Sequence, residues 1–379
     1  MIEFSRTTAK TLVQYAKRGF KPEFPNWTLC FELSRGITRD ATNMFGERLF
    51  DARHAPILRR QSEQFGTIQG WFACRQHNLL LETVQLNGLE HLWLRSRPDE
   101  AGTNRLVVLY YHGGAFAVQC PRAYISFCSS LIAATKQEFA SQSTGSRVVV
   151  DVFIANYRKV PEFQFPVPAE DAMTMYEYLL QHERLQPSQI ILAGDSAGGN
   201  LVLSTLLRVR DGISSWKPKL PLPLAAIAVC PATDLSGNDD ENEGQHCILS
   251  PNLTAACFHA YHPTVEDPNT WADASPVHCD LRGLPPVFVQ AGSFDYVFKH
   301  SLRLMAKAKA DGITNWELDV HEGMPHVFTF HSSFVLPYVQ VGFQRMAAFV
   351  VKQFLGAASV DMKASSTDAE IAKMSGSAA

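Results

Sequence analysis

Six short apolar runs, separated by stretches of helical character, constrain the fold of this chain more than any other feature. Most of these runs are almost continuously apolar or β-branched, which indicates strands that are buried on both faces. Strands of this kind that alternate with helices are typical of an α/β fold with a mostly parallel sheet between two helical layers. The runs occupy residues 106–112, 147–157, 189–194, 224–231, 285–292 and 315–323.

A hairpin is expected before the first of these runs. Residues 77–97 form two runs of alternating character around Asn87-Gly88. An Asn-Gly pair between two such runs is a strong signal for a tight turn between antiparallel strands. The sequence therefore predicts two antiparallel strands ahead of the parallel ones.

Three segments fall outside this α/β pattern, which extends over a predicted core of residues 66–355. Residues 1–65 carry aromatic side chains among polar ones without strand alternation, which predicts an apolar face laid over another part of the chain. Residues 235–275 connect two predicted strands, and so long a connection is usually functional or a lid. Residues 356–379 are small and polar, so we expect a disordered tail.

Composition narrows the class of protein. The net charge is −3 with basic and acidic residues dispersed, which argues against a nucleic-acid partner. The eight cysteines include no C-x-x-C pair, which indicates reduced thiols rather than disulfides or a zinc site. No segment reaches the about 18 apolar residues of a membrane span, and no signal peptide is recognisable. We expect a cytoplasmic protein without stable membrane insertion.

The run at 189–194 leads into the sequence GDSAGG of residues 194–199. A G-x-S-x-G sequence between a strand and a helix is typical of a sharp turn that exposes the serine hydroxyl at a helix N-terminus. Ser196 is therefore a candidate nucleophile. A phosphate-binding loop is the alternative, but the P-loop lysine and the spaced glycines of a dinucleotide site are absent. A purely structural turn is the other alternative.

A nucleophilic serine needs a base, an acid that orients the base, and donors for the oxyanion. Asp295 follows the run at 285–292, and His326 follows the run at 315–323. Ser, Asp and His thus each come after a strand, in an order known for such triads. The rival bases are His321 and His331, and the rival acids are Asp273, Asp280 and Asp319.

The oxyanion donors are expected to be backbone N–H groups, one after the serine and others in a glycine-rich loop after an earlier strand. The sequence His112-Gly113-Gly114-Ala115 follows the run at 106–112 and fits that loop. We interpret His112 as an anchor of this loop rather than as a second base.

These motifs resemble those of the hormone-sensitive-lipase-like branch of the α/β-hydrolases, which are carboxylesterases marked by His-Gly-Gly-Gly and Gly-Asp-Ser-Ala-Gly-Gly. The likeness covers roughly residues 75–355 and extends to the segments 156–171, 230–236, 274–292 and 323–328. The resemblance implies the α/β-hydrolase fold, with Ser196 as nucleophile, Asp295 as acid and His326 as base. It also implies three oxyanion donors, which are the N–H groups of Gly113, Gly114 and Ala197.

The resemblance further implies a cap built from residues 1–65 and 235–275.

Two departures from the motifs of this branch stand out: Ala115 replaces the third glycine, and Lys299 stands where the branch has a second acidic residue after the catalytic acid. Four aromatic residues near the motifs are expected to bind substrate: Phe116, Tyr157, Phe298 and Phe328.

The resulting hypothesis is a serine hydrolase that cleaves the carboxylic ester of an apolar small molecule through an acyl-enzyme, without metal or cofactor. An amidase of arylformamidase type and a hydrolase of natural-product biosynthesis are alternatives that keep the same three side chains. A non-catalytic receptor on the same fold is a third alternative, against which the presence of His326 argues. A homodimer is left open.

Overall fold

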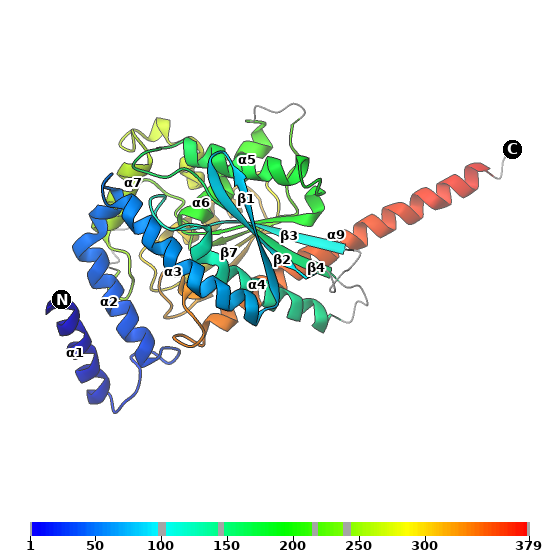
Figure 1. The fold of residues 1–379 in the computed structure, drawn as a ribbon. Helices are drawn as coiled ribbons and strands as arrows, with labels where there is room; N and C mark the ends of the chain where they lie inside the picture. Colours follow the sequence, from blue (N-terminus) through cyan, green and yellow to red (C-terminus); the bar gives the residue numbers. More distant parts are fainter. Residues whose placement is uncertain (1, 98–103, 143–147, 214–218, 238–243, 377–379) are drawn as a thin grey trace.

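The computed structural model describes residues 2–97, 104–142, 148–213, 219–237 and 244–376, and in these ranges an eight-stranded sheet crosses the molecule (Figure 1). The strand order is β1-β2-β4-β3-β5-β6-β7-β8. The strands are β1 (Leu79–Leu86), β2 (Leu89–Ser96), β3 (Asn104–Tyr111), β4 (Val148–Ala155), β5 (Ile190–Asp195), β6 (Ala225–Val229), β7 (Val287–Gly292) and β8 (Glu317–His321).

Strands β3 to β8 pair in parallel with their neighbours, while β1 pairs antiparallel with β2 and β2 with β4. The mostly parallel α/β class is therefore confirmed. The β1–β2 turn lies at Asn87 and Gly88, whose φ angles of 51° and 72° are the left-handed values that such a turn requires.

Helices cover both faces of the sheet because the central strands are apolar on both. In β3, Val107, Leu109 and Tyr111 face one core, whereas Leu106 and Val108 face the other. The first core is covered by α5 (Val167–Gln181), α6 (Ala197–Asp211) and α8 (Phe298–Ala310), and the second by α4 (Ile125–Ser141) and α9 (Val339–Gly376). Short 3₁₀ helices lie at Pro121–Tyr124, Pro187–Gln189, Pro268–Thr270, Ala272–Ala274, Pro276–His278 and Phe328–Phe330.

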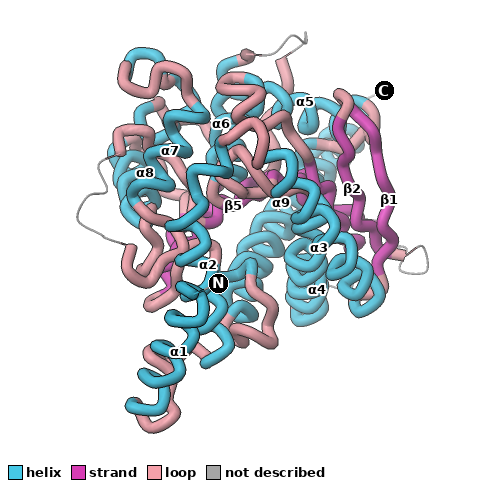
Figure 2. Tube along the Cα trace, turned by 60° about the vertical axis from the view of Figure 1, so that its left-hand side comes forward, coloured by secondary structure: helices cyan, strands magenta, loops and turns pink. Residues whose placement is uncertain are grey.

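The N-terminal segment forms helices that lie along one side of the molecule (Figures 1 and 2). They are α1 (Ile2–Lys17), α2 (Leu29–Phe45), the 3₁₀ helix Gly46–Phe50 and α3 (Ala55–Gln76). Trp27 Nε1 donates to the Gly323 carbonyl oxygen at 2.8 Å, and the rings of Phe24 and Phe294 are 4.7 Å apart. The segment thus lies against the two loops that carry Asp295 and His326.

The insertion between β6 and β7 packs against these N-terminal helices. Its helix is α7 (Pro251–Tyr261), and residues 238–243 of the predicted insertion lie outside the described residues. Arg39 and Thr42 of α2 donate to the carbonyl oxygens of Cys247 and Ile248, at 2.5 Å and 2.7 Å. The two segments are therefore held together by hydrogen bonds.

Two predicted boundaries differ from the structure. Helix α3 runs through the expected cap boundary at 65/66 without a break, because the sequence there contains no proline. Helix α9 continues to Gly376 and projects from the body (Figure 1), over residues expected to form a disordered tail. That tail contains seven alanines and no proline, so its composition permits a helix. None of the described helices combines the length and the apolarity that crossing a bilayer requires.

Candidate active site

Ser196 occupies the turn between β5 and α6, with φ 52° and ψ −117°. The flanking glycines explain how so tight a turn forms. A Cβ atom on Gly194 would lie 2.5 Å from the Gly198 carbonyl oxygen, and one on Gly198 would lie 2.0 Å from the Tyr111 carbonyl oxygen. Any larger residue at either position would collide with backbone, so this turn requires glycine there.

Three side chains from separate strand ends meet at this turn. His326 Nε2 lies 2.9 Å from Ser196 Oγ, and His326 Nδ1 lies 2.8 Å from Asp295 Oδ2. Asp295 is fully buried and His326 is 6% exposed. Ser196 follows β5, Asp295 follows β7 and His326 follows β8. The three residues predicted from the sequence thus form one chain of hydrogen bonds in the structure.

Asp295 also receives hydrogen bonds on its other oxygen. The Val297 N–H donates to Oδ1 at 3.0 Å, and Cys247 Sγ lies 3.8 Å from the same oxygen. Burial raises the pKa of the Cys247 thiol to about 12, so it is a neutral donor. Cys247 comes from the insertion, and sequence reasoning missed its contact with Asp295.

Cys230, Asp295 and His326 could in principle hold a metal ion, since their ligand atoms lie within 4.8 Å of one another. Hydrogen bonds to these side chains explain why they lie so close together without a metal ion, however. The Val327 N–H donates to Cys230 Sγ at 3.3 Å, and His326 is engaged by Asp295. Burial also raises the pKa of the Cys230 thiol well above its ordinary value, which favours the protonated form.

Asp195, the residue before the serine, ties the His112–Ala115 loop to the turn. Its buried carboxylate accepts hydrogen bonds from Tyr110 Oη at 2.9 Å, Tyr124 Oη at 2.8 Å and the Gly113 N–H at 3.0 Å. Burial raises its pKa to about 6, and these three donors act in the opposite direction. A Cβ atom on Gly113 would lie 2.3 Å from Asp195 Oδ2.

This contact corrects the expected set of oxyanion donors. The N–H of Gly113 is taken up by Asp195, so it is not free for a substrate oxygen. The N–H groups of Gly114, Ala115 and Ala197 have no hydrogen-bond acceptor among the described residues. The left-handed φ angles of Gly114 (110°) and Ala115 (54°) redirect the loop at this point. The N–H groups that lack an acceptor in this loop are therefore those of Gly114 and Ala115, whereas the prediction named Gly113 and Gly114.

His112 anchors the same loop. Its ring nitrogens lie 2.7 Å from the Gly113 carbonyl oxygen and 3.3 Å from Asn156 Oδ1, and Tyr157 Oη donates to the His112 carbonyl oxygen at 2.8 Å. Burial lowers the pKa of His112 to about 3, so the ring is neutral. These contacts agree with the interpretation of His112 as a structural residue.

The rival residues lie in other interactions. His321 Nε2 is 2.7 Å from Asp319 Oδ2, and His321 Nδ1 is 3.2 Å from Tyr338 Oη. Asp273 is paired with Arg208 at 2.6 Å. None of these groups forms a hydrogen bond with Ser196 in the described structure.

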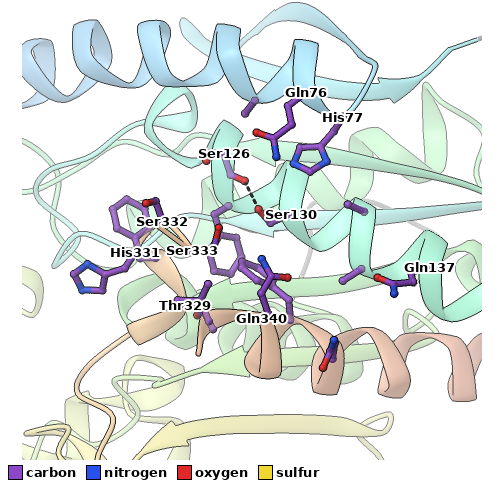
Figure 3. Close-up of a pocket in the computed structure, with 18 residues that line it drawn as sticks. Gln76, His77, Ser126, Ser130, Gln137, Thr329, His331, Ser332, Ser333 and Gln340 are labelled. Atoms are coloured by element: carbon purple, nitrogen blue, oxygen red, sulfur yellow. Dashed lines mark hydrogen bonds between the residues drawn. The ribbon is translucent and has the colours of Figure 1, made fainter. Parts of the chain in front are cut away.

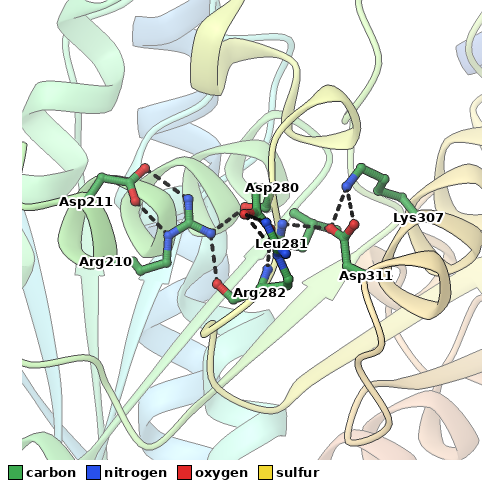
Figure 4. Close-up of polar contacts among 7 residues, drawn as sticks. All are labelled: Arg210, Asp211, Asp280, Leu281, Arg282, Lys307 and Asp311. Carbon is green, nitrogen blue, oxygen red and sulfur yellow. Dashed lines mark hydrogen bonds and ion pairs between the residues drawn. The ribbon is translucent and has the colours of Figure 1, made fainter.

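The two remaining rivals are also accounted for. Asp280 belongs to a surface network in which Arg282 holds its carboxylate and Arg210 reaches its carbonyl oxygen (Figure 4). His331 directly follows the 3₁₀ helix Phe328–Phe330, and its ring centroid lies 4.9 Å from that of Phe31. Burial lowers the pKa of His331 to about 4.

A small apolar cavity opens at Ser196, with a volume of about 30 Å³. Of the four aromatic residues expected to bind substrate, only Phe116 lines it. Tyr157 is buried with its hydroxyl on His112, Phe328 packs against His321, and Phe298 is absent from the lining. The insertion supplies lining residues that sequence reasoning did not identify: Leu249, Leu253, Thr254, Cys257 and Phe258.

A larger hollow of about 190 Å³ lies between α3, α4 and the start of α9 (Figure 3). Its polar lining comes from amide, hydroxyl and imidazole side chains, and none of Ser196, Asp295 and His326 belongs to it. It is therefore separate from the cavity at Ser196. The labelled lining residues are Gln76, His77, Ser126, Ser130, Gln137, Thr329, His331, Ser332, Ser333 and Gln340.

Lys159 is buried beside the anchor of the His112–Ala115 loop. Its Nζ donates to the Asn156 side chain and, at 2.9 Å, to the Tyr157 carbonyl oxygen. Burial, reinforced by the Arg59 guanidinium, lowers the pKa of Lys159 to about 7. The carboxylates of Asp171 and Glu162 and the thiol of Cys120 act in the opposite direction.

Replacement of Lys159 by Met is expected to stabilise the protein more at low pH than at high pH. The unfolded chain holds this proton up to a pKa of 10.5, so wild-type stability rises as the pH increases from about 7 to about 10.5. The cost of the buried charge is fully present below about pH 7. The difference in Tm between Lys159→Met and wild type, measured by thermal unfolding at about pH 6 and about pH 9, tests this expectation. An equal difference in Tm between Lys159→Met and wild type at both pH values would contradict this account.

The sequence matches a known family over most of the region that forms this site. Residues 108–330 match the model of a family described as alpha/beta hydrolase fold. Among solved structures, a crystal structure of EstE5 soaked with ethyl alcohol has a TM-score of 0.65 and 25% sequence identity. The structural alignment covers 79% of this chain and 92% of EstE5.

Three curated proteins show which enzymes the chain is similar to. An acetyl-hydrolase of Streptomyces hygroscopicus is 29% identical over 260 residues, which cover 68% of this chain and 78% of the relative. Versiconal hemiacetal acetate esterase of Aspergillus parasiticus is 28% identical over 290 residues, covering 73% and 84%. Hormone-sensitive lipase of Homo sapiens is 31% identical over 192 residues, which cover 48% of this chain and 16% of that lipase.

Proposed function

Since this chain belongs to the alpha/beta hydrolase fold family, in its ester-cleaving, hormone-sensitive-lipase-like branch, we propose that it hydrolyses esters through an acyl-enzyme formed on Ser196. The observation that carries the proposal is the chain of hydrogen bonds from Ser196 Oγ through His326 to Asp295, at 2.9 Å and 2.8 Å. Ser196 is the nucleophile, His326 is the general base, and Asp295 holds the imidazole in the required orientation.

The first half of the reaction forms the acyl-enzyme. His326 Nε2 takes the proton of Ser196 Oγ as the oxygen attacks the ester carbonyl, and the N–H groups of Gly114, Ala115 and Ala197 stabilise the negative charge on the carbonyl oxygen. The tetrahedral intermediate then collapses. His326 gives the proton to the departing alcohol, and the acyl group stays on Ser196.

The second half regenerates the enzyme. A water molecule attacks the acyl carbon while His326 accepts one of its protons, and the same N–H groups hold the oxyanion again. Collapse releases the carboxylic acid as the proton returns to Ser196 Oγ. Asp295 remains ionised beside the imidazolium in both halves and stabilises its charge.

The acyl group is proposed to be short, with acetyl as the best fit. The cavity at Ser196 holds about 30 Å³, and Leu253, Cys257 and Phe258 of α7 form much of its apolar wall. The related proteins of Streptomyces hygroscopicus and Aspergillus parasiticus are, by their names, an acetyl-hydrolase and an acetate esterase. Cavity and relatives therefore support the same substrate class.

The acyl preference is tested with p-nitrophenyl esters of increasing chain length. We expect kcat/KM to be highest for the acetate and to fall for the butyrate and octanoate, because longer chains do not fit against α7. Leu253→Ala, which removes part of this wall, is expected to reduce the preference for acetate. A wild-type maximum at octanoate would contradict the short-acyl proposal.

A second candidate is the deacetylation of a bulky natural-product intermediate. The similarity to versiconal hemiacetal acetate esterase, which spans 84% of that enzyme, is the observation that favours it. Naphthyl acetate compared with ethyl acetate tests this candidate, since a site for a polycyclic alcohol would favour the former. The amidase alternative is tested by the matched acetanilide, which an esterase would leave nearly intact.

A further inference from the structure

Helix α3 presents an apolar face to solvent. Four of its members lie within residues 65–72 at spacings of three residues, with two adjacent at the end, and the fifth lies eight residues, or about two turns, earlier. All five therefore share one side of the helix. Scattered exposed apolar residues are ordinary, but a contiguous set of this size marks an interaction site. We call this set the α3 apolar face: Ile57 (55% exposed), Phe65 (63%), Ile68 (62%), Trp71 (53%) and Phe72 (61%).

The opposite side of α3 is packed too closely for the helix to turn this face inward. A Cβ atom on Gly66 would lie 2.5 Å from the Ala123 backbone nitrogen, and one on Gly70 would lie 2.6 Å from Ile125 Cδ1. Arg59 Nε also donates to a carbonyl oxygen of the core, that of Ala117, at 2.6 Å. The helix is thus fixed at the surface beside α4 (Figure 2), with its aromatic residues outward.

The apolar surface continues into a groove between α2 and α3. The groove holds about 370 Å³ and shares Ile57 with the α3 apolar face. Such a groove can accept an alkyl chain, whereas a polar partner would find few groups to bind. Its apolar lining includes Ala41, Phe45, Leu49, Ile57 and Leu58.

Positively charged side chains lie beside this surface. Arg60 and Arg75 are exposed, and the guanidinium of Arg75 lies 4.8 Å from the centre of the Trp71 ring. Glu63, the acidic residue of α3, lies 3.9 Å from Arg122. Residues 1–76 contain twelve Lys or Arg and seven Asp or Glu, although the whole chain carries a net charge of −3. The positive charge is therefore concentrated in the segment that contains α3.

We propose that the α3 apolar face docks the protein on the surface of an anionic lipid bilayer, with α3 lying in the plane of the interface. Aromatic and aliphatic side chains enter the boundary between headgroups and acyl chains, and Arg60 and Arg75 contact the anionic headgroups. A second copy of the chain fits less well. A twofold contact through this face would bring the positive N-terminal segments of both copies together.

The test is co-sedimentation of the full chain with phosphatidylcholine vesicles, with and without phosphatidylglycerol. We expect binding to the anionic vesicles that weakens with added salt, and a blue shift of tryptophan fluorescence as Trp71 leaves water. The variant Phe65→Ser/Ile68→Ser/Trp71→Ser/Phe72→Ser is expected to bind at least about tenfold more weakly. The variant Arg60→Glu/Arg75→Glu should bind anionic vesicles more weakly by a similar factor, and its binding to vesicles without phosphatidylglycerol should not change.

The matched control removes exposed apolar side chains elsewhere. Ile213→Ser/Leu302→Ser/Phe334→Ser is expected to bind like wild type, and all variants should keep the wild-type Tm and hydrolyse soluble esters normally. Failure of wild type to bind anionic vesicles would overturn the proposal, as would equal binding by the four-serine variant. A dimer in light scattering that the four-serine variant dissociates would identify a second copy as the occupant instead.

Discussion

Ser196→Ala is expected to lower kcat for p-nitrophenyl acetate by on the order of a million-fold, the size of effect known for loss of a catalytic serine. The substitution removes the oxygen that lies 2.9 Å from His326 Nε2, and with it the site of acylation. Binding of the ester should change little, because the cavity wall and the backbone donors stay in place. Steady-state hydrolysis and inactivation by an organophosphate measure the loss.

A matched serine distinguishes this loss from damage to the fold. Ser130 lies on α4 and lines the separate hollow of Figure 3, so Ser130→Ala should hydrolyse the ester at the wild-type rate. Circular dichroism should show the same Tm for Ser196→Ala as for wild type within a few degrees. Unchanged hydrolysis in Ser196→Ala would rule out the proposed nucleophile.

His326→Ala is expected to cost about as much as loss of the serine, because a serine without its base cannot be deprotonated during attack. His321→Ala is the matched control, since His321 ends β8, five residues before His326, but contacts Asp319 and Tyr338. We expect His321→Ala to lower stability and to leave most of the activity. The pH dependence of kcat/KM, measured on both variants, separates the two roles.

The reverse result would identify another base. If His321→Ala abolished hydrolysis while His326→Ala kept most of it, then the hydrogen bond between His326 and Ser196 would not be the catalytic one. The pair of Asp319 and His321 would then be the relevant acid and base. That outcome would require a movement of β8, because neither residue reaches Ser196 in the described structure.

The features that follow from sequence are those with short-range causes. The parallel strands were predictable because a strand buried on both faces must be apolar throughout. Ser196 was recognisable because its turn admits only glycine at positions 194 and 198, and the structure shows backbone contacts at both. Asp295 and His326 could be named because the carboxyl ends of parallel strands meet at one edge of the sheet.

The features that escaped prediction depend on tertiary contacts. The Gly113 N–H could not be assigned to Asp195 from the sequence, because that hydrogen bond joins a loop to the end of β5, 82 residues further along the chain. The residues of α7 at Ser196 were not identifiable because nothing in the sequence says which side of a short helix faces the site. Tyr157 and Phe328 were placed in the site on their aromatic character, yet both are core residues.

The most direct test of the proposed chemistry is the mass of the protein during turnover. Wild-type enzyme mixed with p-nitrophenyl acetate and quenched in acid within milliseconds should carry one acetyl group, which peptide mapping should place on Ser196. Three variants are measured in the same way. Acetylation should be slow in His326→Ala, absent in Ser196→Ala and normal in Ser130→Ala. An acetyl group on another residue in wild type, or hydrolysis by wild type with no acylated species at any quench time, would contradict the acyl-enzyme on Ser196.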